Sequence, residues 1–181
     1  KRVTTNDYGS ADYYYVNKSS LPKVYGGFNT SLSWKGFDLS AIFAYSIGGY
    51  IYNRDITMIL HNGSLEGRDW STEILRRWTP DNRYTDVPAL STTSNNWNSA
   101  STRFLQNNSY MRLKNLTLSY NLPKQWISKL SLSSVQVYVQ GDNLFTIHRN
   151  QGLDPEQGIT GITYYRYPAM RTISGGINVS F

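Results

Sequence analysis

The chain has 181 residues, of which 39% are hydrophobic, 14% aromatic and only 17% charged. A chain this aromatic and this weakly charged is not intrinsically disordered, and no apolar run approaches the roughly 18 residues of a membrane-crossing helix. The formal net charge of +6 raises the question of a nucleic-acid ligand. The arginines, however, are scattered over expected loops and form no basic stripe interleaved with aromatics, so no nucleic-acid partner is expected. The absence of cysteine excludes disulfides, thiol catalysis and cysteine-bound metals.

Four segments alternate apolar and polar residues with a period of two, which predicts half-buried strands over 24–34, 37–49, 134–147 and 171–181. A fifth segment, 110–122, alternates cleanly only in its second half. In the first half, Leu113 has the wrong parity for the apolar set, and Arg112 and Lys114 have the parity of the apolar residues. Two explanations stay open: a bulge shifts the phase near Lys114, or the first half lies beyond the apolar environment.

The connections between these segments run short, long, short, long. Lys35-Gly36 predicts a tight hairpin turn, and the link after Pro123 is moderately short, with a helical turn expected around 125–129. By contrast, 50–108 and 148–171 are too long for simple turns, and loops of that size are usually functional or disordered.

The first long connection contains one helix signal. The run 69–80 predicts a short helix that Asp69 caps and Pro80 stops, with Trp70, Ile74 and Trp78 along one side.

The alternation favours a transmembrane β-barrel over a soluble sandwich. The apolar faces carry no charge across their central spans, and the opposite faces are rich in Ser, Asn, Gln, Thr and Gly, as a wet lumen would be. Aromatic residues cluster at the strand ends like two interfacial girdles, and short turns on one side with long loops on the other match periplasmic and extracellular ends. We therefore expect the lipid-facing set to include Phe28, Leu32, Phe43, Leu118, Val137 and Ile177, and the lumen-facing set to include Asn29, Ser40, Thr117, Gln136, Gln140 and Asn178.

Five strands cannot close a barrel, because an open edge in lipid leaves backbone groups unpaired and the smallest bacterial barrels have about eight strands. The expected fold is an all-β, antiparallel transmembrane β-barrel fragment. The sequence starts at Lys1 without a signal peptide, and we expect the missing strands upstream of Lys1 and the natural C-terminus at Phe181.

The ordered motifs resemble a known family. SYMRLKNLTLSYNLPK, VQVYVQGDNLFTI, GLDPE and YPAMRTISGGINVSF follow one another, after LPKVYGGFNTSLSWKGFDLSAIFAY and RRWTPDN. In this order and spacing, from Leu21 onward, they resemble the C-terminal end of the SusC/RagA group of TonB-dependent outer-membrane transporters.

The resemblance implies a barrel of about 22 strands with an N-terminal plug, of which residues 1–181 supply the last five strands. It implies import of a nutrient, a glycan or an oligopeptide, across the outer membrane of a Gram-negative bacterium. The energy would come from the TonB complex, contacted through the N-terminal part that this chain lacks. A SusD-like surface lipoprotein would form a lid over the barrel. No cofactor is implied, and the C-terminal Phe181 resembles a barrel-assembly signal.

No catalytic constellation is present, so the chain is not expected to be an enzyme. Asp154 and Glu156 are spaced like an acid–base pair, but Pro155 and the flanking glycines indicate a constrained loop whose carboxylates hydrogen-bond backbone amides or a partner. His61 and His148 lie far apart without co-ligands, so no metal is expected.

Aromatic loop residues are the remaining candidates. Trp97, Tyr164 and Tyr165 suit stacking on sugar rings, although interfacial anchoring or contact with the lid is the favoured reading. The residues expected to contact substrate or lid are Trp97, Asp154, Glu156, Tyr164, Tyr165 and Arg166. The alternative class is a soluble all-β carbohydrate-binding module, which would need no detergent for extraction.

Overall fold

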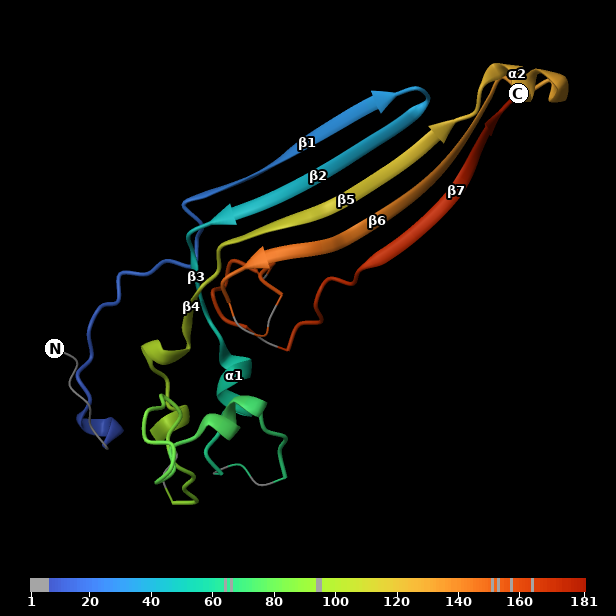
Figure 1. Ribbon diagram of the computed structural model, residues 1–181. Helices are drawn as coiled ribbons and strands as arrows, with labels where there is room; N and C mark the ends of the chain where they lie inside the picture. Colours follow the sequence, from blue (N-terminus) through green and yellow to red (C-terminus); the bar gives the residue numbers. More distant parts are fainter. Residues whose placement is uncertain are drawn as a thin grey trace. The chain divides into compact units, whose positions relative to one another are not determined.

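The computed structural model describes residues 7–63, 65, 67–93, 96–150, 152, 154–156, 158–163 and 165–181. Its main feature is a five-stranded antiparallel sheet in the order β1-β2-β5-β6-β7 (Figure 1). All five predicted strands are confirmed, and the bounds are β1 Val24–Trp34, β2 Phe37–Ile47, β5 Tyr110–Asn121, β6 Ser134–His148 and β7 Thr172–Ser180.

The chain divides into two compact units. The sheet unit comprises Leu21–Gly49, Asn107–Gln157 and Tyr167–Phe181, and the loop unit comprises the chain up to Ser20 with Tyr50–Gln106 and Gly158–Arg166. The two long connections of the sheet therefore supply most of the loop unit.

The short connections of the sheet follow the chemistry of their residues. Lys35 and Gly36 both have positive φ, 49° and 86°, which is the type I′ geometry that matches the twist of a hairpin. The predicted helical turn after Pro123 is present as α2 Lys124–Ile127 followed by the 3₁₀ turn η5 Ser128–Leu130. Both connections lie at one end of the sheet, and the long connections leave from the other end (Figure 1).

A β-bulge explains the phase shift in β5. Ile42 pairs with Asn115 and Phe43 pairs with Leu113, so Lys114 is an extra residue with no partner in β2. On the other side, Leu113 pairs with Phe145 and Asn115 with Asp142. The bulge reverses the parity of β5, which confirms the first of the two explanations and places Leu113 on the same face as Phe43.

The register gives the sheet two chemically different faces. Phe28 lies opposite Phe43, with the rings stacked at 4.7 Å, and Leu39 lies opposite both Leu32 and Leu118. We call this the apolar face, and it also carries Val137 and Ile177. The opposite, polar face carries Asn29, Ser40, Thr117, Gln136, Gln140 and Asn178. Each predicted set therefore lies on one face.

The loop unit is built from short elements around a small core. They are η1 Tyr8–Ser10, β3 Tyr50–Tyr52, α1 Arg54–Ile59, η2 Thr72–Arg76, η3 Asn96–Asn98, η4 Thr102–Phe104 and β4 Leu105–Asn107. Ile51, Val87 and Phe104 are its most buried apolar side chains. Among the described residues no helix is long and apolar enough to cross a membrane.

The helix predicted over 69–80 is shorter than expected, and its predicted cap is wrong. It is the single 3₁₀ segment η2, and Ser71, rather than Asp69, caps it by accepting a hydrogen bond from the Glu73 amide. Ser71 takes this role because it stands directly before the first helical residue, where a side-chain oxygen reaches the free amides. Of the predicted apolar side, only Ile74 is buried, whereas Trp70 and Trp78 are 41% and 44% exposed.

Candidate functional site

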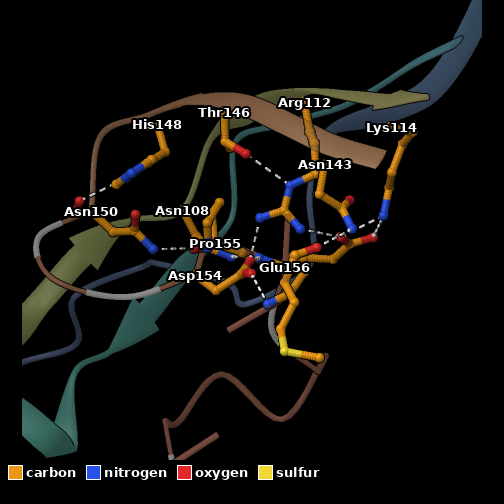
Figure 2. A network of polar contacts seen from close by, with 12 residues as sticks. Asn108, Arg112, Lys114, Asn143, Thr146, His148, Asn150, Asp154, Pro155 and Glu156 are labelled. Atoms are coloured by element: carbon orange, nitrogen blue, oxygen red, sulfur yellow. Dashed lines mark hydrogen bonds and ion pairs between the residues drawn. The ribbon is translucent and has the colours of Figure 1, made fainter. Parts of the chain in front are cut away.

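The best-formed polar site of the sheet unit is a charged network centred on Arg112 (Figure 2). Arg112 lies in β5 between Ala44 and Thr146, on the polar face. Its Nη2 donates to Asp154 Oδ1 at 2.6 Å, its Nη1 to Glu156 Oε2 at 2.8 Å, and its Nε to Thr146 Oγ1 at 2.9 Å. One guanidinium therefore connects the strand wall to the connection between β6 and β7.

Further contacts hold the same connection. Lys114, the bulge residue, donates from Nζ to both oxygens of Glu156 at 2.6 Å. Asn108 donates to the carbonyl of Pro155 at 2.9 Å and accepts from Asn150 at 3.0 Å. We call residues 154–156, held by Arg112, Lys114 and Asn108, the loop anchor.

The loop anchor has a buried half and an exposed half. The side chains of Arg112 and Asp154 are only 4% and 8% exposed, whereas those of Lys114 and Glu156 are 33% and 37% exposed. A buried charge is tolerated only when it is paired and hydrogen-bonded. Asp154 meets this condition, because it also accepts from the amides of Glu156 and Ala169.

The pKa of Asp154 follows from these contacts. Burial raises the pKa of this carboxyl, but the Glu156 amide, the Arg112 side chain, the Ala169 amide and the Arg112 charge together lower it below its ordinary value. The ionised form is therefore the one that the folded loop holds.

We expect the loop anchor to loosen in acid. Because the pKa of Asp154 is lowered on folding, its contribution to stability is complete above the ordinary aspartate pKa of about 3.9 and is lost as the pH falls through the lowered folded value. Hydrogen exchange at the Ala169 amide, normalised to the intrinsic rate at each pH, should accelerate below about pH 4. In an Asp154→Asn variant this amide should exchange with no such pH dependence. A wild-type profile that is flat down to pH 2 would contradict the assignment.

The structure separates the six predicted contact residues. Asp154 and Glu156 lie in the sheet unit, and Trp97, Tyr165 and Arg166 lie in the loop unit. Tyr164 lies outside the described residues. The expectation that the carboxylates bind backbone amides is confirmed for Asp154, whereas the expected contacts of all six residues with substrate or lid remain predictions.

Trp97 occupies a structural position in the loop unit. Its indole Nε1 donates to the Leu60 carbonyl at 2.5 Å, and the Arg103 guanidinium lies 3.3 Å from the ring centroid. One face of the ring is thus already occupied by a cation, which leaves at most the other face for a sugar. Burial lowers the pKa of Arg103.

We expect Trp97→Ala to destabilise the loop unit by about 2 kcal/mol, since it removes a hydrogen bond worth about 1 kcal/mol and a cation–π contact of similar size. Limited proteolysis of the full-length protein should cut between residues 60 and 100 at least tenfold faster. Trp78→Ala is the matched control because Trp78 is 44% exposed, and its cleavage rate should stay near that of the wild type.

Tyr165 is exposed and held by its backbone. Its φ is +35°, its side chain is 71% exposed, and its amide donates to Asp55 Oδ1 at 3.2 Å. Residues 158–163 are also integrated into the loop unit, because the Thr163 hydroxyl accepts from the Arg54 amide and Gly161 accepts from the Tyr52 amide. The ring is therefore presented to solvent from a fixed backbone.

Sequence reasoning missed Arg112 as the centre of the site. The available signal was the pair of cations Arg112 and Lys114 inside a segment of alternating strand residues, where buried charges need counter-charges. The GLDPE motif supplies them, but the pairing spans 42 residues along the chain.

Comparisons with known proteins agree with one another. The TonB-dependent receptor P3 of Formosa agariphila is 34% identical over an alignment of 166 residues, and the match covers 86% of this chain and 16% of that protein. SusC of Bacteroides thetaiotaomicron is 27% identical over 168 residues, or 92% of this chain and 16% of that protein. No protein-family model matches the chain.

Solved structures give the same result. The RagAB peptide importer in its closed-closed state covers 99% of this chain with 35% identity and a TM-score of 0.83, and the open-open state matches with the same values. The matched region is 19% of that chain. The present chain therefore spans about one sixth to one fifth of the length of its relatives.

The antiparallel sheet, with one apolar face, one polar face and long connections at one end only, has the features of a transmembrane β-barrel segment, and its match to the RagAB importer identifies it as one. The similarity over nearly the whole chain specifies which kind of β-barrel protein it comes from. The chain belongs to the SusC/RagA-like TonB-dependent receptors of the Gram-negative outer membrane. This location excludes the soluble carbohydrate-binding module, and the relatives are named as receptors and transporters, not as enzymes.

Proposed function

We propose that this chain forms part of the wall and loops of an outer-membrane transporter that imports a nutrient with TonB-derived energy. The observation that carries the proposal is the agreement of 99% of the chain with the RagAB peptide importer at 35% identity. The match has the same TM-score of 0.83 against the closed-closed and open-open states, so the similarity does not depend on which state is compared.

The polar face is proposed to line the lumen. Its side chains already form a hydrogen-bonded layer: Asn178 donates to Gln136 at 3.2 Å, and Gln136 donates to Ser119 at 3.3 Å. Amides and hydroxyls arranged in this way can exchange partners with water or with a polar solute. The face suits both candidate substrates, a glycan and an oligopeptide, and the peptide importer among the solved structures favours the oligopeptide.

The loop unit is proposed to meet a SusD-like lipoprotein lid. Tyr84, Tyr165 and Ile159 of the loop unit are exposed by 102%, 71% and 75%. Aromatic residues that keep a polar tip are the ones enriched at protein interfaces. Arg166 lies beside Gly158, in the same segment as Ile159 and Tyr165, and adds a cation to that segment.

Uptake in the native host tests the transport proposal. Deleting the gene should abolish growth on a defined oligopeptide mixture or glycan as the sole nutrient, and deleting TonB should have the same effect. Uptake that persists in both strains would overturn the proposal.

A double variant, Tyr165→Ala with Arg166→Ala, tests the lid proposal. It should reduce copurification of a SusD-like lipoprotein, because both side chains leave the exposed surface while the buried Thr163 contacts stay intact. Leu75→Ala, at a residue that is 73% exposed elsewhere in the loop unit, is the matched control. Equal copurification of both variants with the wild type would count against this surface.

A further inference from the structure

A pocket of about 500 Å³ lies within the loop unit, between the segment that precedes β1 and the strands β3 and β4. Its first wall comes from the segment 8–16, and its second wall comes from Tyr52, residues 100–102 and Leu105. The volume falls within the range of about 300–1,000 Å³ that small-ligand sites occupy.

Local contacts hold the two walls in place. The Tyr8 hydroxyl donates to the Ala100 carbonyl at 2.7 Å and so joins the first wall to the second. Asp7 caps η1, the turn that carries Tyr8. On the second wall, the Tyr52 ring packs edge-on against Phe104, with the ring centroids 6.2 Å apart. The pocket is therefore formed before any ligand arrives.

Aromatic rings and one carboxylate define the chemistry of the pocket. Four of the lining residues are tyrosines: Tyr8, Tyr13, Tyr14 and Tyr52. Tyr13 and Tyr14 are 84% and 71% exposed, so the pocket is open to solvent on their side. Asp12 is the only charged residue among the described lining residues. In the part of the chain that the structure describes, its carboxylate has no ion-pair or hydrogen-bond partner.

The Tyr52 side of the pocket adds no second anion. Burial raises the pKa of the Tyr52 hydroxyl, which therefore stays neutral. The Arg54 charge acts on the same hydroxyl in the opposite direction, so Arg54 lies near this side, although it is not one of the described lining residues. A cationic ligand group is accordingly favoured at Asp12 and disfavoured at the Tyr52 side.

We propose that this pocket holds the lysine or arginine side chain of an oligopeptide, with the cationic group at Asp12 and the carbon stem along the tyrosine rings. The face of an aromatic ring attracts a cation, and a long cationic side chain buries its stem against apolar surface while its charge stays in water. Asp12 would repel an acidic side chain. Long connections mark the extracellular end of a barrel, so the loop unit belongs to the side from which a peptide arrives. The inference rests on the proposed import of oligopeptides and names the peptides that bind best.

Two synthetic peptides test the role of charge. Both are capped at their ends and are identical and uncharged except at one position, which is lysine in one peptide and norleucine in the other. Norleucine has the same carbon stem without the ammonium group. Calorimetry on the full-length transporter should show that the lysine peptide binds about fivefold more tightly, the combined effect of an exposed ion pair and a cation–π contact. Salt at about 1 M should reduce this preference, because it screens exposed charges.

Three variants locate the preference. Asp12→Asn should lower it from about fivefold to below about twofold, with unchanged affinity for the norleucine peptide. Asp81→Asn is the matched control, because Asp81 is an exposed acidic residue of the same unit outside the described pocket lining, and it should keep the preference. Tyr14→Ala should weaken the binding of both peptides, because it removes apolar surface from the pocket. All three side chains are exposed, and an unchanged pattern of limited proteolysis shows that each variant is folded.

The proposal is overturned if Asp12→Asn keeps the full preference for lysine, if Asp81→Asn loses it equally, or if the wild type binds both peptides equally. Uptake by cells separates this result from the transport proposal. Uptake of both peptides without any preference in binding would overturn the pocket and leave transport standing. A lysine preference in binding without uptake of either peptide would support the pocket and count against transport.

Discussion

Replacing Arg112 with methionine is expected to release the loop anchor and to cost about 3–5 kcal/mol, the usual consequence of removing one partner from a buried ion pair. The cost is large because Asp154, 8% exposed at its side chain, would keep its charge without a cation. Hydrogen–deuterium exchange of the full-length protein should show lost protection at the amides of Glu156 and Ala169, which Asp154 accepts from.

Lys114→Met is the matched control for this prediction. Lys114 shares Glu156 with Arg112, but both partners are about one-third exposed, and an exposed pair contributes about 0–1 kcal/mol. Exchange at Ala169 should therefore stay within a factor of about five of the wild type. If the two variants lose protection to the same extent, the burial of the Arg112–Asp154 pair is not what holds the loop.

Leu118→Arg is expected to block insertion of the full-length barrel into the outer membrane. Leu118 lies on the apolar face between Leu39 and Val139, and an arginine on the lipid side of a barrel costs about 2–4 kcal/mol at the bilayer midplane, less toward the interfaces. The amount of heat-modifiable protein in the outer-membrane fraction is the measurement, and it should fall at least fivefold.

Thr117→Arg places the same charge one residue away, on the polar face. If that face lines a hydrated lumen, the variant should insert at close to the wild-type level, because a charge in water carries no such penalty. Equal insertion of both variants would mean that the two faces meet the same environment, and the assignment of lipid and lumen would fail.

The strands were predictable because a membrane wall imposes a period of two, which Val24–Trp34 follows and which Phe37–Ile47 follows except at Ile42, an apolar residue on the polar face. The hairpin at Lys35-Gly36 was predictable because the turn chemistry is local. The bulge at Lys114 was visible only as a conflict of parity, since sequence periodicity reports that a phase changes and not how the chain accommodates the change.

The site was less predictable than the fold. The constrained loop at Asp154 and Glu156 could be inferred from Pro155 and the nearby glycines, but its partner Arg112 could not, because side-chain pairing across 42 residues leaves no periodic trace. The predicted cap Asp69 was wrong because the cap is set by the exact start of η2, directly after Ser71, and the sequence alone did not show where that start lies. The contact of the Arg103 guanidinium with the Trp97 ring was likewise not predictable, because the sequence does not show where Arg103 lies in space.

The position of Arg112 also makes the loop anchor sensitive to how the wall is assembled. Arg112 Nε bonds Thr146 across the β5–β6 pair, so Arg112 reaches Asp154 from the polar face only when these strands are in the native alignment. A slip of one residue would turn the Arg112 side chain to the apolar face and leave Asp154 without a counter-charge. The anchor can thus close only after correct strand alignment, and an open, protease-accessible 154–156 segment would mark a misassembled barrel.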